Sequence, residues 1–201
     1  MITVLLADDE HLIRGALASL LALEDDITVV AQAGTGDEAL AMARVHRPDV
    51  AVLDLQMPGP DGVTVAAELR DTLPGCVSMI VTSHARAGAL KRALGAGVRG
   101  FVPKTVSAHH LAEIIRTVHT GGRYIDPELA ADAIAVGESP LTAREAELLS
   151  YAEDGAPVGD IASRARLSAG TVRNYLSSAA MKLGAENRHV AARTARERGW
   201  L

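Results

Sequence analysis

The residues of this chain best suited to chemistry are polar side chains that end or follow short apolar runs in its first half. They are Asp8, Asp9, Asp54, Thr82 and Lys104. Crowded carboxylates repel one another unless a cation joins them, and hard oxygen ligands with room for water suit Mg²⁺. A lysine and a threonine hydroxyl would stabilise a phosphoryl group arriving on one carboxylate. The set therefore predicts a Mg²⁺-assisted phosphoryl acceptor, whose acyl phosphate suits a reversible signal.

Taken singly, each of these residues has an ordinary explanation. An aspartate at a strand end is more often a helix cap or a loop residue. Thr82 is a favourable strand residue, and Lys104 could be a surface lysine. Their occurrence at successive strand ends favours a site, because ligands of open α/β sheets bind where the strands reach their carboxyl edge.

The runs before these residues are apolar at nearly every position, which is typical of strands buried on both faces of a parallel sheet. Segments with helical spacing separate them; two examples are Leu12, Ala16, Leu20 and Leu23, and Val63, Ala66, Ala67 and Leu69. Five strands alternating with five helices predict an open α/β sheet. The expected strands are Ile2–Ala7, Ile27–Ala33, Val50–Leu53, Val77–Thr82 and Gly100–Val102.

The pattern changes after Gly121-Gly122. A short helix is expected from Asp126-Pro127 to about Val136, because Asp can cap a helix and Pro suits its first turn. Thr142 and Glu145 predict a capping box, and no strand pattern follows it. Further helices are expected at 143–154, 158–165, 169–183 and 188–198. The predicted organisation is an α/β domain over 1–121, a linker with a short helix over 122–140, and an all-α domain over 141–201.

Charge is distributed unevenly between these parts. Residues 1–159 hold 12 Lys and Arg against 22 Asp and Glu, whereas residues 160–201 hold 8 against 3. A basic second domain predicts a polyanionic partner, although a solvated basic surface would look the same. The single cysteine, Cys76, argues against a disulfide framework. No apolar stretch reaches the roughly 18 residues of a membrane helix, so a soluble cytoplasmic protein is expected.

Four motifs of the first domain occur in a specific order. They are Leu6-Ala7-Asp8-Asp9-Glu10, Asp54-Leu55-Gln56-Met57-Pro58-Gly59, Val81-Thr82-Ser83 and Gly100-Phe101-Val102-Pro103-Lys104. Over about the first 120 residues the chain thereby resembles the receiver domain of two-component response regulators. The resemblance implies a flavodoxin-like (βα)5 fold with strand order 2-1-3-4-5.

The resemblance also implies a role for each residue. Asp54 would accept a phosphoryl group from a sensor histidine kinase. Asp9 would bind Mg²⁺ directly, Asp8 largely through water, and Gln56 through its backbone carbonyl. Thr82 and Lys104 would contact the phosphoryl group. Phe101 would occupy the family's aromatic switch position and turn inward on phosphorylation, unless it is plain core packing. Many receivers have Pro after the lysine, but Thr105 stands here, so no cis peptide is expected.

A second set of motifs marks the C-terminal domain. They are Leu141-Thr142-Ala143-Arg144-Glu145, Ile161-Ala162, Leu167-Ser168, Thr171-Val172-Arg173-Asn174-Tyr175, Lys182-Leu183-Gly184 and Asn187-Arg188. This set is similar to the LuxR-type helix-turn-helix of the NarL/FixJ subfamily, which implies binding to double-stranded promoter DNA. The runs Ala85–Gly88, Thr171–Tyr175 and Arg198–Trp200 are similar to DesR-type regulators, which partner a membrane sensor kinase and regulate lipid desaturation.

The proposed recognition helix has one apolar and one polar side. Val172, Leu176, Ala179 and Leu183 should face the domain core, which leaves a polar face for a major groove. Arg173 and Asn174 are candidates for base edges, with Ser177 on the same face. Thr171 and Lys182 are placed for phosphates, and a solvated helix face is the alternative. Pro157-Val158-Gly159 replaces the usual polar lead into the motif, so affinity should depend more on dimerisation.

The predicted mechanism is a homodimer formed on phosphorylation, with two recognition helices about one DNA turn apart. Phosphorylation would change the surface of helices 85–96 and 107–120. The expected dimer residues are Leu12, Arg14, Leu17, Leu111, Ile115 and Val118, although their apolar members could instead face the sheet. One alternative is a phosphorylation-independent DNA binder. Another is a Mg²⁺-dependent phosphatase. That class needs a second acid two residues after the nucleophile, and Gln56 at that position argues against it.

Overall fold

The computed structural model describes residues 1–83, 87–135, 137, 139–153 and 155–201. The predicted DesR-type segment Ala85–Gly88 therefore lies partly outside the described residues. The chain forms two compact units, one made mainly of residues 1–131 and the other mainly of residues 132–201. The boundary falls within the predicted linker. None of the described helices is both long and apolar enough to cross a membrane.

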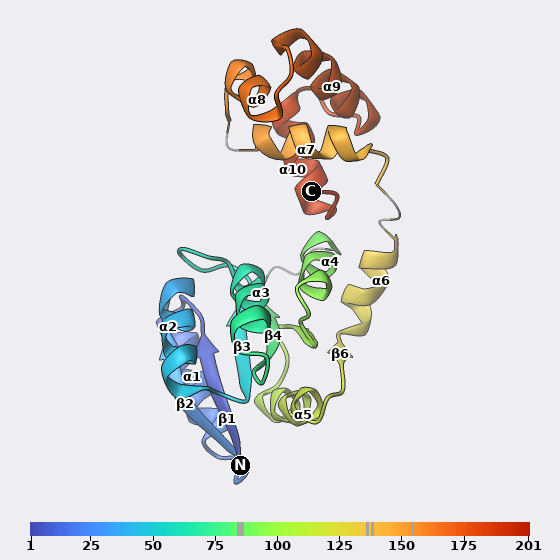
Figure 1. Ribbon diagram of the computed structural model, residues 1–201. Coiled ribbons are helices and arrows are strands. Elements are labelled where there is room, and N and C mark those ends of the chain that lie inside the picture. Colours follow the sequence, from blue (N-terminus) through green and yellow to red (C-terminus); the bar gives the residue numbers. More distant parts are fainter. Residues whose placement is uncertain (84–86, 136, 138, 154) are drawn as a thin grey trace. The chain divides into compact units, whose positions relative to one another are not determined.

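The first unit is built on a parallel sheet, shown with its helices in Figure 1. The strand order is β2-β1-β3-β4-β5-β6, which confirms the predicted order of the first five. A sixth short strand at the edge, which the sequence did not predict, pairs Tyr124 with Gly100. The strands are β1 (Ile2–Ala7), β2 (Ile27–Ala33), β3 (Val50–Asp54), β4 (Val77–Thr82), β5 (Gly100–Pro103) and β6 (Tyr124–Ile125).

Helices cover the sheet on both faces, as the apolar strands require. On one face, α1 and α5 contact each other, and on the other α2 contacts α3. An ion pair of 2.5 Å between Arg92 and Asp61 joins α4 to the N-cap of α3. The helices are α1 (His11–Leu21), α2 (Gly36–His46), α3 (Gly62–Thr72), α4 (Ala87–Gly95) and α5 (Ala108–His119).

Helix α1 places the two leucines predicted for a dimer surface, Leu12 and Leu17, on different sides. Leu21 is fully buried and Leu17 packs against the core. Within the helix, Leu12 is 83% exposed and Leu20 is 45% exposed, and Leu23, just beyond its end, is 78% exposed. The helix is leucine-rich on two sides, so helical spacing alone cannot identify the buried side. An apolar stripe of α1 therefore faces outward.

The apolar residues of α5 behave in the opposite way. Leu111, Ile115 and Val118 are completely buried against the sheet. Their predicted role in a dimer surface is corrected here, because a side chain enclosed by its own core has no surface to offer a partner. The outward face of α5 is instead polar.

The second unit consists of short helices around a core of alanine, leucine and valine. The capping box of Thr142 and Glu145 is confirmed, and Ser168 and Asn187 cap the next two long helices. The turn before α9 contains Arg166 in the left-handed region, at a φ of 55°. The helices, close to their predicted bounds, are α6 (Pro127–Ala135), α7 (Ala143–Ala152), α8 (Val158–Ala165), α9 (Ala169–Lys182) and α10 (Arg188–Glu197).

Candidate functional site

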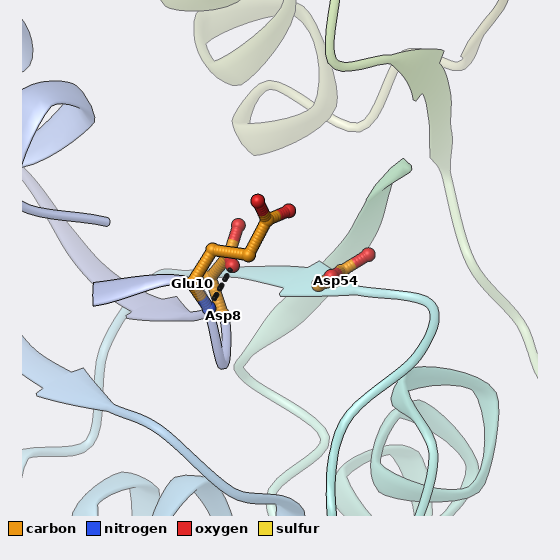
Figure 2. Close-up of side chains that lie close together, drawn as sticks. All are labelled: Asp8, Glu10 and Asp54. Carbon is orange, nitrogen blue, oxygen red and sulfur yellow. Dashed lines mark hydrogen bonds between the residues drawn. The ribbon is translucent and has the colours of Figure 1, made fainter. Parts of the chain in front are cut away.

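Two acidic residues meet at the carboxyl edge of the sheet. Strands β1 and β3 are neighbours in register, with Ala7 opposite Leu53, so Asp8 and Asp54 end side by side. Asp8 is 5% exposed and Asp54 is 7% exposed. Figure 2 shows the side chain of Glu10 beside this pair. The carboxylate oxygens of Asp8, Glu10 and Asp54 lie within 4.8 Å of one another.

Lys104 brings the positive charge to this cluster. Strands β4 and β5 pair Thr82 with Pro103, and the backbone N–H of Lys104 donates to the carbonyl of Thr82 at 2.9 Å. Its ammonium group, in a side chain 10% exposed, lies 2.8 Å from Asp8, 2.8 Å from Glu10 and 3.0 Å from Asp54. Thr82 itself is 1% exposed, at the end of β4. One cation is therefore shared by three carboxylates.

The contacts between Lys104 and the three carboxylates affect the pKa values of Lys104 and Asp54. Burial raises the pKa of Asp54 above its ordinary value, and the nearby Asp8 charge adds to the rise, although Lys104 opposes it. Burial alone would lower the pKa of Lys104, but its hydrogen bonds to the three carboxylates outweigh burial and raise it. The lysine is consequently a permanent cation, whereas Asp54 is a desolvated carboxylate with incomplete charge compensation.

The loop after Asp54 is held by close backbone contacts. The backbone N–H of Gln56 hydrogen-bonds the Asp54 carboxylate, and the N–H of Gly62 donates to the carbonyl of Leu55 at 3.1 Å. A Cβ at Gly62 would lie 2.1 Å from the carbonyl oxygen of Asp54. Only glycine fits there, so the start of α3 packs directly against the backbone of the acceptor residue.

The oxygen-rich cluster fits a hard divalent cation. Such ions take carboxylate oxygens together with water, and three carboxylates within 4.8 Å supply that donor set. The ammonium group of Lys104, hydrogen-bonded to all three acids, shows that the cluster accommodates positive charge. The cluster can therefore hold a metal ion.

In the second unit, α9 has the predicted two-sided character. Val172 and Ala179 are fully buried and Leu176 is 4% exposed, while Leu183 packs partly against the core. The opposite side carries the exposed side chains of Arg173, Asn174 and Ser177. A groove of about 480 Å³ runs beside this polar side toward the start of α10; its lining includes Arg173, Ser177, Met181, Asn187 and Arg188.

Two known families match the chain. Residues 4–116 match the response regulator receiver domain, and residues 139–195 match the bacterial regulatory proteins of the luxR family. The chain is a LuxR-family response regulator. The regulator is 42% identical over 201 residues to the transcriptional regulatory protein DesR of Bacillus subtilis (strain 168), and both chains are covered completely.

Two further relatives agree with this assignment. The DNA-binding transcriptional activator DevR/DosR of Mycobacterium tuberculosis is 35% identical, with 96% of this chain and 93% of that protein covered. The crystal structure of the response regulator ChrA, from a heme-sensing two-component system, is 32% identical with a TM-score of 0.60. It covers 100% of this chain and 98% of that one. The predicted fold and the prediction of a phosphorylation-controlled, DNA-binding transcriptional regulator are confirmed.

Not every residue assigned from the family's motifs lies where it was expected. Asp8 lies inside the acidic cluster, whereas Asp9 is exposed, and the third carboxylate beside Asp54 is Glu10. The sequence offered a signal for Glu10, since it directly follows the Asp8-Asp9 pair. Its side chain could be placed in the cluster only once the turn into α1 was known.

Phe101 and Arg14 also differ from expectation. The Phe101 ring is 1% exposed, so it is already inward and does not need phosphorylation to turn it there. Arg14 donates a hydrogen bond to the backbone carbonyl of Asp8 and lines a small cavity with Asp8 and Asp54. Arg14, which was predicted for a dimer surface, therefore contacts the acceptor site through its guanidinium group. The described residues contain no cis peptide, so the Lys104-Thr105 bond is trans.

Lys182 and Thr171 have partners within their own domain. The ammonium group of Lys182 lies 2.7 Å from Glu145, whose side chain is 4% exposed. The hydroxyl of Thr171 lies 2.8 Å from that of Ser168, the N-cap of α9. Phosphate contacts by these two residues stay predictions, and for Lys182 the structure gives a competing structural role.

Proposed function

We propose that Asp54 is the phosphoryl acceptor and that its phosphorylation controls dimer formation and promoter binding. The observation that carries the proposal is the buried Asp54 carboxylate, hydrogen-bonded by Lys104 at the edge of the sheet. A phosphohistidine of a sensor histidine kinase is the donor. This protein works in the cytoplasm, where it meets both the kinase and chromosomal DNA.

The chemistry is an in-line displacement on phosphorus. A carboxylate oxygen of Asp54 attacks the phosphorus atom, the bond from phosphorus to the histidine nitrogen breaks, and an acyl phosphate forms. Lys104 stabilises the charge on the phosphoryl oxygens, and the Thr82 hydroxyl hydrogen-bonds one of them. Asp8, Asp9 and Asp54, with the backbone carbonyl of Gln56, would hold Mg²⁺, which would supply further charge neutralisation. The same residues support phosphorylation from small donors and later hydrolysis.

The outward stripe of α1 is the proposed dimer surface in the receiver. Leu12 is 83% exposed and Leu20 is 45% exposed, and burying such apolar side chains against a second copy is favourable. The enclosed residues of α5 make no direct contact in this arrangement. Dimerisation doubles the number of recognition helices, so two half-sites about one DNA turn apart can be read together.

On the DNA side, Arg173 and Asn174 read base edges from α9, with Ser177 beside them. Both longer side chains are exposed and have the two-point geometry that distinguishes bases in a major groove. Loss of one two-point contact usually costs about 1–3 kcal/mol of discrimination.

Sedimentation and site selection together test this function. Wild-type chain treated with Mg²⁺ and acetyl phosphate should shift to a dimer and select a two-half-site sequence from random DNA duplexes. The Asp54→Asn chain should stay monomeric under the same treatment. Arg173→Ala should weaken sequence preference, while Arg193→Ala, at an exposed arginine of α10, serves as the charge-matched control. An Asp54→Asn chain that dimerises and binds as fully as wild type would refute the proposal.

A further inference from the structure

The three partners of Lys104 differ in their exposure to solvent. Asp8 and Asp54 are buried, whereas the Glu10 side chain is 54% exposed at the mouth of the site. All three donors of the ammonium group are therefore used, two by deep carboxylates and one by a carboxylate at the rim.

Glu10 also differs from the N-cap residues of the receiver helices α2, α3 and α5. It occupies the N-cap position of α1, and its own backbone N–H donates to Asp8 at 2.8 Å. Its side chain makes no capping hydrogen bond, unlike those of Thr35, Asp61 and Ser107 in the same domain. The carboxylate lies instead beside Asp8 and Asp54 (Figure 2). There it accepts a hydrogen bond from the ammonium group of Lys104 at 2.8 Å.

A divalent cation and Lys104 compete for the same oxygens. To bind at Asp8 and Asp54, the cation needs lone pairs that now accept from the ammonium group. Lys104 must then give up two partners, and a buried ammonium group without partners is costly. A carboxylate at the rim lowers that cost, because it keeps the lysine paired while the deep acids are released.

We propose that Glu10 is a positioning residue that retains Lys104 at the rim while Asp8 and Asp54 take up Mg²⁺. This inference rests on the proposed function, since it concerns the same site. Glu10 acts through the lysine rather than as a metal ligand. The held lysine then stands beside Asp54, where the phosphoryl group arrives.

Calorimetric Mg²⁺ titration of the full chain tests this inference through a double-mutant cycle. Glu10→Gln should weaken Mg²⁺ binding about three- to tenfold, in the lower part of the range of coupling between contacting residues. Lys104→Gln should bind Mg²⁺ more tightly than wild type, because the competing cation is gone. In the Lys104→Gln background, Glu10→Gln should have no further effect. Asp25→Asn removes one exposed charge from the same domain and serves as the matched control.

The outcomes separate the possible roles of Glu10. A loss of affinity that persists without Lys104 would mean that Glu10 binds the metal itself, and it would overturn the inference. So would wild-type affinity in Glu10→Gln. Glu10→Asp keeps the charge but shortens its reach, so it should also lose affinity; full retention would show that charge alone matters. A wild-type chain that binds no Mg²⁺ would overturn the proposed function as well.

Discussion

The two domains each bury a carboxylate beside a lysine, but they satisfy it very differently. In the helical domain, Glu145 is 3% exposed and is the one acid among the described residues that pairs with the ammonium group of Lys182. It also accepts from the backbone N–H and hydroxyl of Thr142 and from the hydroxyl of Ser178. In the receiver, Asp54 shares its one lysine with two other acids.

The difference appears in the acid strength of the two groups. Burial alone would raise the pKa of Glu145, but its hydrogen bonds from Lys182, Ser178 and Thr142 lower the pKa to about 2. Burial raises the pKa of Asp54 with less compensation. A carboxylate that receives a lysine and three further donors holds helices together, while one whose charge is less fully compensated is available as a nucleophile.

Removing the charge of Glu145 should produce the largest effect. Glu145→Gln leaves Lys182 without its partner and weakens the capping box of α7, so the helical domain should lose about 3 kcal/mol of stability. Trp200, the single tryptophan of the chain, packs on the core of this domain and reports its unfolding in urea. Glu147→Gln, which breaks a half-exposed pair with Arg144, should cost less than about 1 kcal/mol. Equal losses in the two variants would show that the buried contacts of Glu145 add no more stability than an exposed ion pair.

The Glu145 carboxylate should also make the stability of the helical domain depend on pH in acid. The ordinary pKa of a glutamate is 4.5, and that of folded Glu145 is about 2. Its contribution to stability is therefore fully present above pH 4.5 and is lost as the pH falls through about 2. Trp200 fluorescence should show the helical domain weakening over that interval in wild type, with a smaller change in Glu145→Gln. Identical acid curves would contradict the role given to Glu145.

Asp54 should respond with the opposite sign. Its folded pKa lies above the ordinary value of 3.8, so its contribution to stability is greatest at low pH and is lost as the pH rises through the folded pKa. At neutral pH, Asp54→Asn removes a desolvated charge and should stabilise the receiver by about 1 kcal/mol. Hydrogen exchange of the β3 amides measures this change within the receiver alone. Faster exchange in the variant would mean that the Asp54 charge stabilises the folded receiver, and it would contradict this prediction.

Much of the fold could be predicted from the sequence because its periodicities are clean. The buried strand β3 is apolar from Val50 to Leu53, and helix caps such as Ser168 stand just before their helices. The strand Tyr124–Ile125 was missed because two residues are too few to show an alternation of apolar and polar side chains. The sequence could not separate Leu12 from Leu17 because leucines occupy both sides of α1, and only packing on the sheet decides which of them is exposed.

The site could be predicted as a set of residues but not as a set of contacts. Asp54, Thr82 and Lys104 were found because each ends or follows a strand. Glu10 and Asp9 are neighbours, and the turn after β1 decides which of them enters the cluster. Lys182 looked free for DNA because Glu145 stands 37 residues away in the chain and meets it only after folding.

The most direct test of the central claim is the intact mass of the chain after incubation with Mg²⁺ and acetyl phosphate, followed by peptide mapping. Wild type should gain one phosphoryl group, located on the peptide that contains Asp54, and should lose it slowly as the acyl phosphate hydrolyses. Asp54→Asn should gain none under the same conditions. A wild-type chain that takes up no phosphate, or an Asp54→Asn chain that takes up as much as wild type, would contradict the account.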